Sequence, residues 1–432
     1  MKAALLGIIL IISSVSHAQF SGDPEQFLKD VNKYLGASNR IKTKEFMDVF
    51  EPNWLTNFSS EYQNKVISTS NLIVAKRLPP FPEIYGYLLS VHSFVLTKQP
   101  EESFNSWHVT IDALLESKKV KKFRDFIEIC ADFFTDGTIY YSTNHVWKVR
   151  GGTYVFDFVK NAPKIIFENV DLQCYIVNRK ADKRENPYFD STIVRNTSGL
   201  HEPLINKWTG RGGTVDWQKV GLEKQSNYAE ITDYMMSLKS TKVESDSALV
   251  YTDYYDTPLY GTFSDIAKKI NREVDRVYPQ FTSFSKKIIR KDILPEVDYV
   301  GGFALEGADF SGVGYGSEPA TAVFYKEGKP FVKASSLRIK ANKSLLSSAE
   351  CGITIYLSET DSIFHPGLGI RYDLNSLEFA RGKEGISQAP FKDSYHKLEM
   401  YVDRIIWSRD DPNLDMLWHP LSSRKIAKFE SQ

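Results

Sequence analysis

Tryptophans beside a glycine cluster are the first residues in this sequence whose types and spacing suggest chemistry. Trp208 and Trp217 enclose the segment Trp-Thr-Gly-Arg-Gly-Gly-Thr-Val-Asp-Trp. Its glycines lack the Gly-Lys-Ser/Thr ending of a phosphate loop and the helix-opening third glycine of a dinucleotide fingerprint. Two interpretations stay open: a tight turn between strands with both indoles packed on a sheet, or a stacking surface for a sugar or another flat apolar ligand. In the second, Trp208, Arg211 and Trp217 would be the ligand-binding residues.

The histidines and cysteines form no metal-binding or nucleophile motif. No two histidines stand four residues apart around a glutamate, and the chain has no Cys-x-x-Cys and no Gly-x-Ser-x-Gly. Asp393-Ser-Tyr-His396 places an acid, a hydroxyl and an imidazole within four residues. Members of a catalytic triad meet in space rather than in sequence, so a turn is the favoured interpretation. We expect no metal and no cofactor, and we assign no catalytic residue.

Carboxylates keep a glycan-cleaving hydrolase or lyase as the second alternative. Glycoside cleavage needs two carboxylates roughly 5 to 9 Å apart across the scissile bond. Glu306 and Asp309 lie in a glycine-rich stretch, and Asp157, Asp216 and Asp361 lie near expected strands. Because the chain has 54 acidic residues, the sequence does not select a pair. Whether the protein is an enzyme stays open, and we favour a non-enzymatic role.

The overall composition is that of a folded globular protein without a charge bias. Hydrophobic residues make up 42% of the 432 residues, and 54 basic residues balance 54 acidic ones. A neutral chain offers no electrostatic attraction to the phosphates of nucleic acid, so we expect no nucleic-acid partner. The length suits two or three domains.

The first eighteen residues have the pattern of a secretory signal peptide. Lys2 precedes the small and apolar run Ala3–Ile12, and Ser16-His-Ala18 resembles a cleavage site. No later apolar stretch is long enough to span a membrane as a helix, so we expect no transmembrane segment after cleavage. The expected location is the periplasm, the outer membrane or the exterior. Three cysteines are too few for a disulfide framework, and we expect buried free thiols.

Residues 19–138 have a helical period and are expected to form an all-α domain. Asp23-Pro24 begins a first helix that ends at Gly36, and a second, short helix ends before Pro52. Helices joined by short proline-bearing turns predict antiparallel hairpins, as a bundle or a short α-solenoid. The later expected helices begin at Ser59 or Ser60, Pro82, Pro100 and about Lys118, and the last one runs to Phe134.

Residues 139–421 are expected to form a β-rich domain. Aromatic and β-branched residues increase from Thr138, and glycines between Gly301 and Gly316 alternate with apolar residues at the period of a half-buried strand. One helix is predicted over Thr262–Tyr278, residues 179–200 are predicted to form an exposed loop, and residues 422–432 a polar tail. The expected fold class is therefore α+β, with a helical array followed by an elongated β-solenoid or sandwich.

The helical start, the Trp208–Trp217 turn and the Gly301–Gly316 stretch together resemble an uncharacterised group of large exported envelope proteins of Gram-negative bacteria. The resemblance implies an envelope setting and no particular activity. We therefore expect an exported cell-envelope protein that acts as a non-enzymatic scaffold or interaction protein, with an envelope protein docked on the helical domain. The first alternative is a module that binds carbohydrate or lipid.

Overall fold

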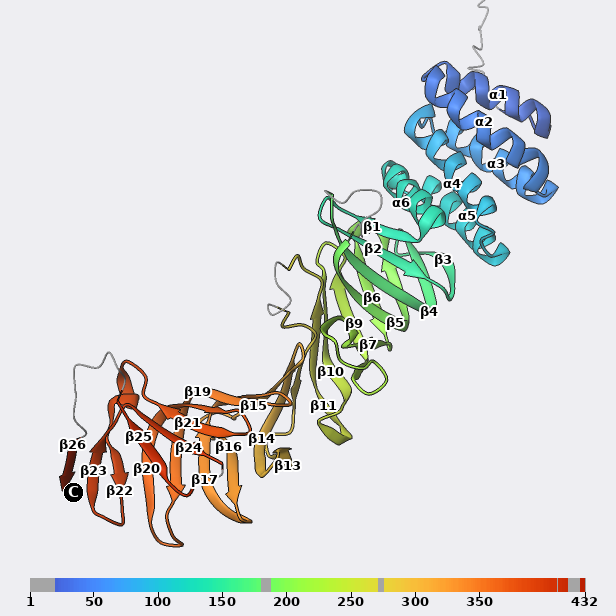
Figure 1. Cartoon of the computed structure of the whole chain (residues 1–432). Helices are drawn as coiled ribbons and strands as arrows, with labels where there is room; N and C mark the ends of the chain where they lie inside the picture. The colour runs from blue at the N-terminus through green and yellow to red at the C-terminus, as the bar shows by residue number, and fades with distance from the viewer. Residues whose placement is uncertain (1–19, 180–187, 271–275, 410, 419–427, 432) are drawn as a thin grey trace, which may run out of the picture. The chain divides into compact units, whose positions relative to one another are not determined.

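A computed structural model describes residues 20–179, 188–270, 276–409, 411–418 and 428–431. The expected signal peptide, residues 1–18, lies outside them. Six α-helices precede a large, mostly antiparallel β region, which confirms the α+β organisation (Figure 1). The chain divides into two compact units. The first contains residues 1–177, 196–209 and 237–239, and the second contains the remainder. None of the described helices is both long and apolar enough to cross a bilayer.

The first three helices begin after a residue whose side chain caps them. Asp23 accepts a hydrogen bond from the Gln26 amide at 2.8 Å, and Ser59 accepts one from the Tyr62 amide at 3.2 Å. Gly137 ends the last helix with a φ of +77°, a conformation that favours glycine. The helices are α1 Pro24–Gly36, α2 Arg40–Asn57, α3 Ser60–Ala75, α4 Tyr85–Leu96, α5 Glu101–Glu116 and α6 Phe123–Asp136.

The predicted second helix is longer than expected. α2 continues through Pro52 to Asn57, so the proline does not end it. Trp54, two residues beyond the proline, is completely buried and packs on Phe27 of α1 and on Phe58, with ring centroids 5.1 and 5.0 Å apart. Burial of this large aromatic ring offsets the helix hydrogen bond that a proline cannot donate.

The first unit joins the helices to a four-stranded antiparallel sheet. Secondary structure changes at Thr138, where it was expected, but the compact unit extends to Val177 because α5 and α6 pack on the sheet. Phe133 of α6 contacts Phe167 at 5.5 Å, and the Ser103 hydroxyl of α5 donates to the Tyr154 carbonyl. The strands lie in the order β1, β2, β4, β3, with bounds β1 Thr138–Tyr141, β2 His145–Arg150, β3 Thr153–Val159 and β4 Ala162–Val177.

The remaining strands form antiparallel pairs that connect mostly neighbours in the sequence. Their bounds are β5 Tyr188–Glu202, β6 Lys207–Arg211, β7 Thr214–Asp216, β8 Tyr228–Ile231, β9 Asp233–Ser237, β10 Lys242–Thr252, β11 Tyr255–Ile266, β12 Gln280–Ser283, β13 Ile288–Leu294, β14 Val297–Glu306, β15 Asp309–Val313, β16 Ala320–Lys326, β17 Lys329–Ser336, β18 Arg338–Ala341, β19 Leu346–Tyr356, β20 Ser362–Tyr372, β21 Ser376–Ala380, β22 Phe391–Asp393, β23 Leu398–Tyr401, β24 Arg404–Ser408, β25 Leu414–Leu417 and β26 Lys428–Ser431.

Long strands connect two rows of strands in the second unit. The first half of β14 pairs with β16 and its second half with β15. β19 likewise pairs with β18 near its start and with β17 near its end, and β20 pairs with β22 and then with β21. Phe324 of β16 contacts Tyr372 of β20 at 5.2 Å between ring centroids. The apolar sides of the two rows therefore face a common core.

The glycine-rich stretch holds a tyrosine inside this core. A Cβ added to Gly301 would lie 2.3 Å from the Tyr299 hydroxyl, and one added to Gly312 would lie 2.4 Å from the Tyr299 ring. Tyr299 is completely buried and donates to the Gly302 carbonyl. The alternation predicted for this stretch is confirmed as β14 and β15, and the glycines make room for the ring.

Three local predictions are wrong. Residues 262–266 belong to β11 rather than to a helix, and Phe263, Asp265 and Ala267 are buried at the two-residue period of a strand; residues 271–275 lie outside the description. Residues 188–200 form most of β5 instead of a loop. Within the expected polar tail, residues 428–431 form β26, which pairs with β23. In each case pairing with other strands overrides the local pattern.

Candidate functional site

The two tryptophans of the sequence-predicted site are both buried, and they belong to different compact units. Trp208 stacks on Phe167 with ring centroids 5.5 Å apart and lies against Gly199, where a Cβ would come within 2.4 Å of the indole. Trp217 packs edge-on against Phe263 at 5.7 Å. Neither indole has a solvent-facing ring, so the stacking surface predicted for Trp208 and Trp217 is wrong. Their segment is the turn between β6 and β7, as the other interpretation predicted.

Arg211 is exposed at the end of β6. The residue before it, Gly210, lies against the ring of Tyr234, and a Cβ there would come within 2.1 Å of that ring. The glycines of this segment therefore serve aromatic packing and the turn, in which Gly212 has a φ of +67°. A ligand contact by Arg211 alone stays a prediction.

The other candidates from the sequence have ordinary structural partners. Asp393 accepts hydrogen bonds from the backbone amides of Tyr395 and His396 and contacts the His396 ring at 2.8 Å, which is a local turn. The Ser394 hydroxyl instead donates to Asp361 at 3.2 Å. Glu306 forms an ion pair with Arg338.

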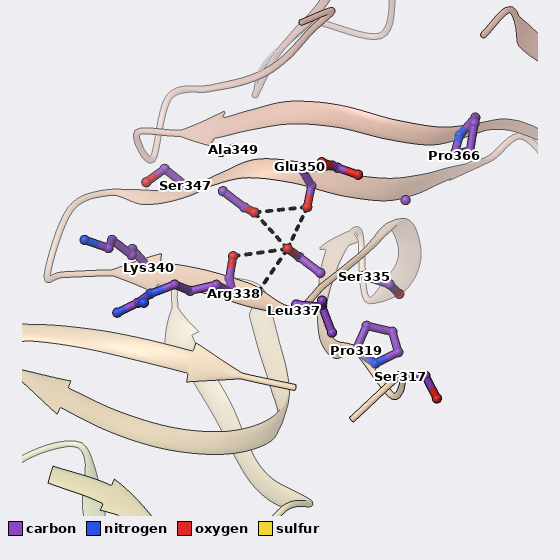
Figure 2. Close-up of a pocket in the computed structure, with 13 residues that line it drawn as sticks. Ser317, Pro319, Ser335, Leu337, Arg338, Lys340, Ser347, Ala349, Glu350 and Pro366 are labelled. Carbon is purple, nitrogen blue, oxygen red and sulfur yellow. Dashed lines mark hydrogen bonds between the residues drawn. The ribbon is translucent and has the colours of Figure 1, made fainter. Parts of the chain in front are cut away.

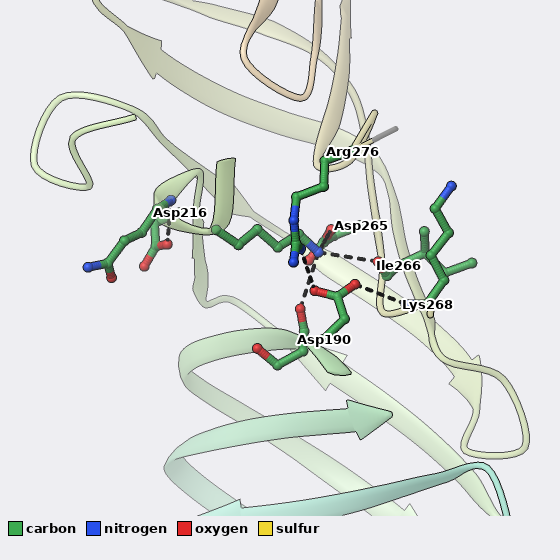
Figure 3. Close-up of polar contacts among 9 residues, drawn as sticks. Asp190, Asp216, Asp265, Ile266, Lys268 and Arg276 are labelled. Atoms are coloured by element: carbon green, nitrogen blue, oxygen red, sulfur yellow. Dashed lines mark hydrogen bonds and ion pairs between the residues drawn. The ribbon is translucent and has the colours of Figure 1, made fainter. Parts of the chain in front are cut away.

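Ion pairs form a cluster in the second unit (Figure 3), and one of them, between Lys219 and Asp265, lines a small pocket of about 230 Å³. Lys219 Nζ lies 2.6 Å from Asp265 Oδ1, and the side chain of Asp265 is only 2% exposed. Arg276 Nη1 lies 2.8 Å from Asp190 Oδ1, and the Lys268 amide donates to the other oxygen of Asp190. Burial raises the pKa of Asp265, although the neighbouring Lys219 ammonium opposes that effect.

The ammonium of Lys219 is fully committed within this cluster. It also donates to the carbonyls of Ser191 and Ile266, both at 3.2 Å, so all three of its protons have acceptors. These contacts connect β5, β11 and the turn after Trp217. The cluster therefore fixes three segments that are distant in the sequence.

A larger groove of about 830 Å³ lies where β17 gives way to β18 and where β19 bends (Figure 2). Its volume lies within the roughly 300–1,000 Å³ typical of ligand pockets. Five serines, two cations and one carboxylate line it, together with apolar groups. The lining residues are Ser317, Pro319, Ser335, Ser336, Leu337, Arg338, Lys340, Ser347, Ser348, Ala349, Glu350, Gly352 and Pro366.

A network centred on Ser336 holds the floor of this groove. The Ser336 hydroxyl donates to the Glu350 carbonyl at 2.6 Å, contacts the Ser348 hydroxyl at 3.0 Å and accepts from the Arg338 amide at 3.2 Å. The pairing register of β19 shifts between Ser348 and Cys351, which frees these backbone groups for serine hydroxyls. The bend of the strand therefore creates the groove and lines it with polar groups.

The two cationic side chains of this groove differ in whether they have an ion-pair partner. Arg338 pairs with Glu306 and donates to the Ser311 hydroxyl at 3.2 Å. Lys340 is exposed, and its ammonium forms no ion pair with any residue that the structure describes. An uncommitted cation beside several hydroxyl groups can bind a polar or anionic ligand. The described residues bring no three His, Cys, Asp or Glu side chains together in a way that could hold a metal ion.

All three cysteines, Cys130, Cys174 and Cys351, are free and buried, as expected. Burial raises the pKa of the Cys130 thiol, and Cys351 lies beneath the groove floor with a pKa that burial also raises. Neither thiol has the exposed, electropositive setting of a reactive cysteine.

Comparisons with known proteins give no relative for this chain. No protein-family model matches it, no curated protein matches it, and no solved structure matches it.

The sequence reasoning missed the groove entirely. Its residues come from five separate strands and loops, and serines carry no motif of their own. One sequence pattern could have indicated the groove. Charged Arg338 and Lys340 alternate with apolar Ile339 and Ala341, and this alternation places both cations on one face of a strand.

Proposed function

We propose that this protein is an exported cell-envelope protein that binds a polar ligand in the groove at the bend of β19 and acts without catalysis. The observation that carries this proposal is the groove itself, with its serine floor and the uncommitted cation Lys340. The signal-like residues 1–18 support export to the periplasm, the outer membrane or the exterior. The stepwise addition of strands to two rows supports an elongated, solenoid-like stack as the scaffold that presents the groove.

A hydroxyl-rich groove favours a carbohydrate over the apolar part of a lipid. Serine hydroxyls donate and accept hydrogen bonds with sugar hydroxyls, and Leu337, 60% exposed, is the large apolar side chain of the lining. The carboxylate of Glu306 beside the groove is paired with Arg338, so it supports the positioning of that arginine rather than glycoside cleavage.

The test is binding of the mature chain to an array of neutral and acidic bacterial polysaccharides. The blocking variant Ser347→Trp fills the groove at an intermediate-exposure position of β19. The matched control Thr354→Trp places the same ring on β19 outside the groove lining. We expect the wild type and T354W to bind at least one polysaccharide and S347W to bind none. Equal binding by all three proteins would refute the groove as the site, and product release from any polysaccharide would refute a non-catalytic role.

A protein partner on the helical array is the second candidate. α2 exposes Ile41, Val49 and Leu55, which are 75%, 53% and 56% accessible, and its face with α1 is hollowed into a groove of about 580 Å³. Apolar residues among charged ones suit an amphipathic segment of an envelope protein. Cross-linking in the native envelope should give one identified partner for the wild type and lose it for I41D/L55D. If the variant kept the partner, the partner would bind at a surface other than this face of α2.

A further inference from the structure

We propose that the ligand of the groove is an acidic polysaccharide whose anionic groups bind Lys340 and Arg371 on either side of Ser347. This inference rests on the proposed function and names its ligand class. It begins from strand register. Lys340 of β18 is the direct partner of Ser347 of β19, and Ser347 is the direct partner of Arg371 of β20.

These three side chains lie on the outer face of their strands. Lys340 is exposed between buried Ile339 and Ala341, and Arg371 is exposed between buried Ile370 and Tyr372. Direct partners on adjacent antiparallel strands have side chains on the same face. A cation, a hydroxyl and a cation therefore follow one another across three strands. Lys340 and Ser347 line the groove, and Arg371 lies on the next strand, outside the lining. Because neighbouring strands are about 4.8 Å apart, the backbones that carry the two cations are about 10 Å apart.

The nearby carboxylates that the structure describes form no ion pair with either cation of the row. Glu378 is the direct partner of Arg371 on β21, but its carboxylate pairs with Arg404 at 3.1 Å. Glu306 pairs with Arg338. Asp373 accepts hydrogen bonds from the Ser376 amide and hydroxyl, which, with Arg371 nearby, hold its pKa below its usual range. Among the residues that the structure describes, neither Lys340 nor Arg371 forms an ion pair.

Glu350 adds a negative charge to the groove. It is exposed on the bend of β19 and lines the groove opposite the cations. A ligand with anionic groups along its whole surface would meet this carboxylate. A polysaccharide that alternates anionic groups with hydroxyl groups can direct its anions to the row and its hydroxyls to Glu350, Ser336 and Ser348. This arrangement distinguishes an acidic polysaccharide from a simple polyanion.

The experiment measures binding of the mature chain to polygalacturonate, neutral dextran and polyphosphate at low and high salt. The test variant is Lys340→Gln with Arg371→Gln, and the matched control is Lys329→Gln with Lys333→Gln, which removes two exposed β17 lysines outside the lining. We expect polygalacturonate to bind, its binding to weaken as salt rises, and its affinity to fall about tenfold for each cation of the row that is removed. The control should retain wild-type affinity, and circular dichroism should confirm that both variants fold.

The alternative outcomes separate this inference from the proposed function. Binding of dextran without polygalacturonate would overturn the acidic ligand class and leave groove binding in place. Polyphosphate binding as tight as polygalacturonate binding would overturn the requirement for a polysaccharide. Equal loss of affinity in the test and control variants would overturn the role of Lys340 and Arg371. Failure of every polysaccharide, together with equal array results for S347W and T354W, would overturn the proposed function as well.

Discussion

Lys219 and Asp265, 46 positions apart in the sequence, form a buried ion pair of 2.6 Å that joins the turn after β7 to β11. Both side chains are largely removed from water, with exposures of 16% and 2%. Taking two charges out of water is costly, and their attraction offsets that cost only when both partners are present.

Removal of one partner of this pair should therefore be more harmful than removal of both. Lys219→Met leaves a buried carboxylate, and we expect a loss of about 3–5 kcal/mol in the free energy of unfolding at pH 7. The double variant Lys219→Met with Asp265→Leu should unfold close to the wild-type value. Urea titrations of all three proteins test this. Equal losses in the single and double variants would show that the lysine acts through its two carbonyl contacts instead.

His201 should be a destabilising residue. It is completely buried, and neither ring nitrogen has a hydrogen-bond partner among the described residues. Because an unpaired buried polar group costs about 1–3 kcal/mol, His201→Leu should stabilise the first unit by a comparable amount.

The matched comparison for this prediction is His108→Leu. His108 is also buried, but its Nδ1 donates to the Phe104 carbonyl and its Nε2 accepts from the Tyr87 hydroxyl, both at 2.9 Å. That variant leaves the buried Tyr87 hydroxyl without its acceptor and should destabilise. Thermal unfolding of the two variants should move in opposite directions. A lower melting temperature for His201→Leu would contradict the prediction.

Stability should fall as the pH falls below about 6.5, the ordinary pKa of histidine. Burial lowers the pKa of His108 and His201 to about 3 and that of His365 to about 4. Between these values and 6.5 the unfolded chain binds protons that the folded chain does not. The unfolding free energy therefore decreases toward acid by about 1.4 kcal/mol per pH unit for each histidine.

Denaturant titrations at pH 7, 6, 5 and 4 test this dependence. The double variant His108→Phe with His201→Leu should have a shallower decrease, because it lacks two of the histidines whose pKa burial lowers. An unfolding free energy that is constant from pH 6.5 to pH 4.5 would contradict neutral burial of these rings.

Substitutions of the glycines around Tyr299 should affect the free energy of unfolding through contact with the Tyr299 ring. An alanine at position 312 would place a Cβ 2.4 Å from the ring, and overpacking of this kind costs about 1–3 kcal/mol. In the background Tyr299→Leu the ring is absent, and Gly312→Ala should cost less. A double-mutant cycle measures the difference. Additive losses would show that the glycine is required for the backbone and not for the ring.

Part of this architecture follows from local sequence. The caps at Asp23 and Ser59, the helical stripes and the alternation through β14 and β15 all act within a few residues, and the structure confirms them. The structure also confirms the α+β organisation and the three free, buried cysteines, which were predicted from the same local patterns. Short-range hydrogen bonds and residue period contain the information that these predictions need.

The rest depends on which strands pair. Residues 262–266 fit a helical stripe as well as a strand, and pairing of β11 with β10 and β12 decides between them. Burial of Trp208 by Phe167 and of Trp217 by Phe263 is decided in the same way. The two-residue period assigns a side chain to a face and leaves open which strand lies beside it. Only the tertiary structure therefore places Lys340, Ser347 and Arg371 in one row, because each comes from a separate strand.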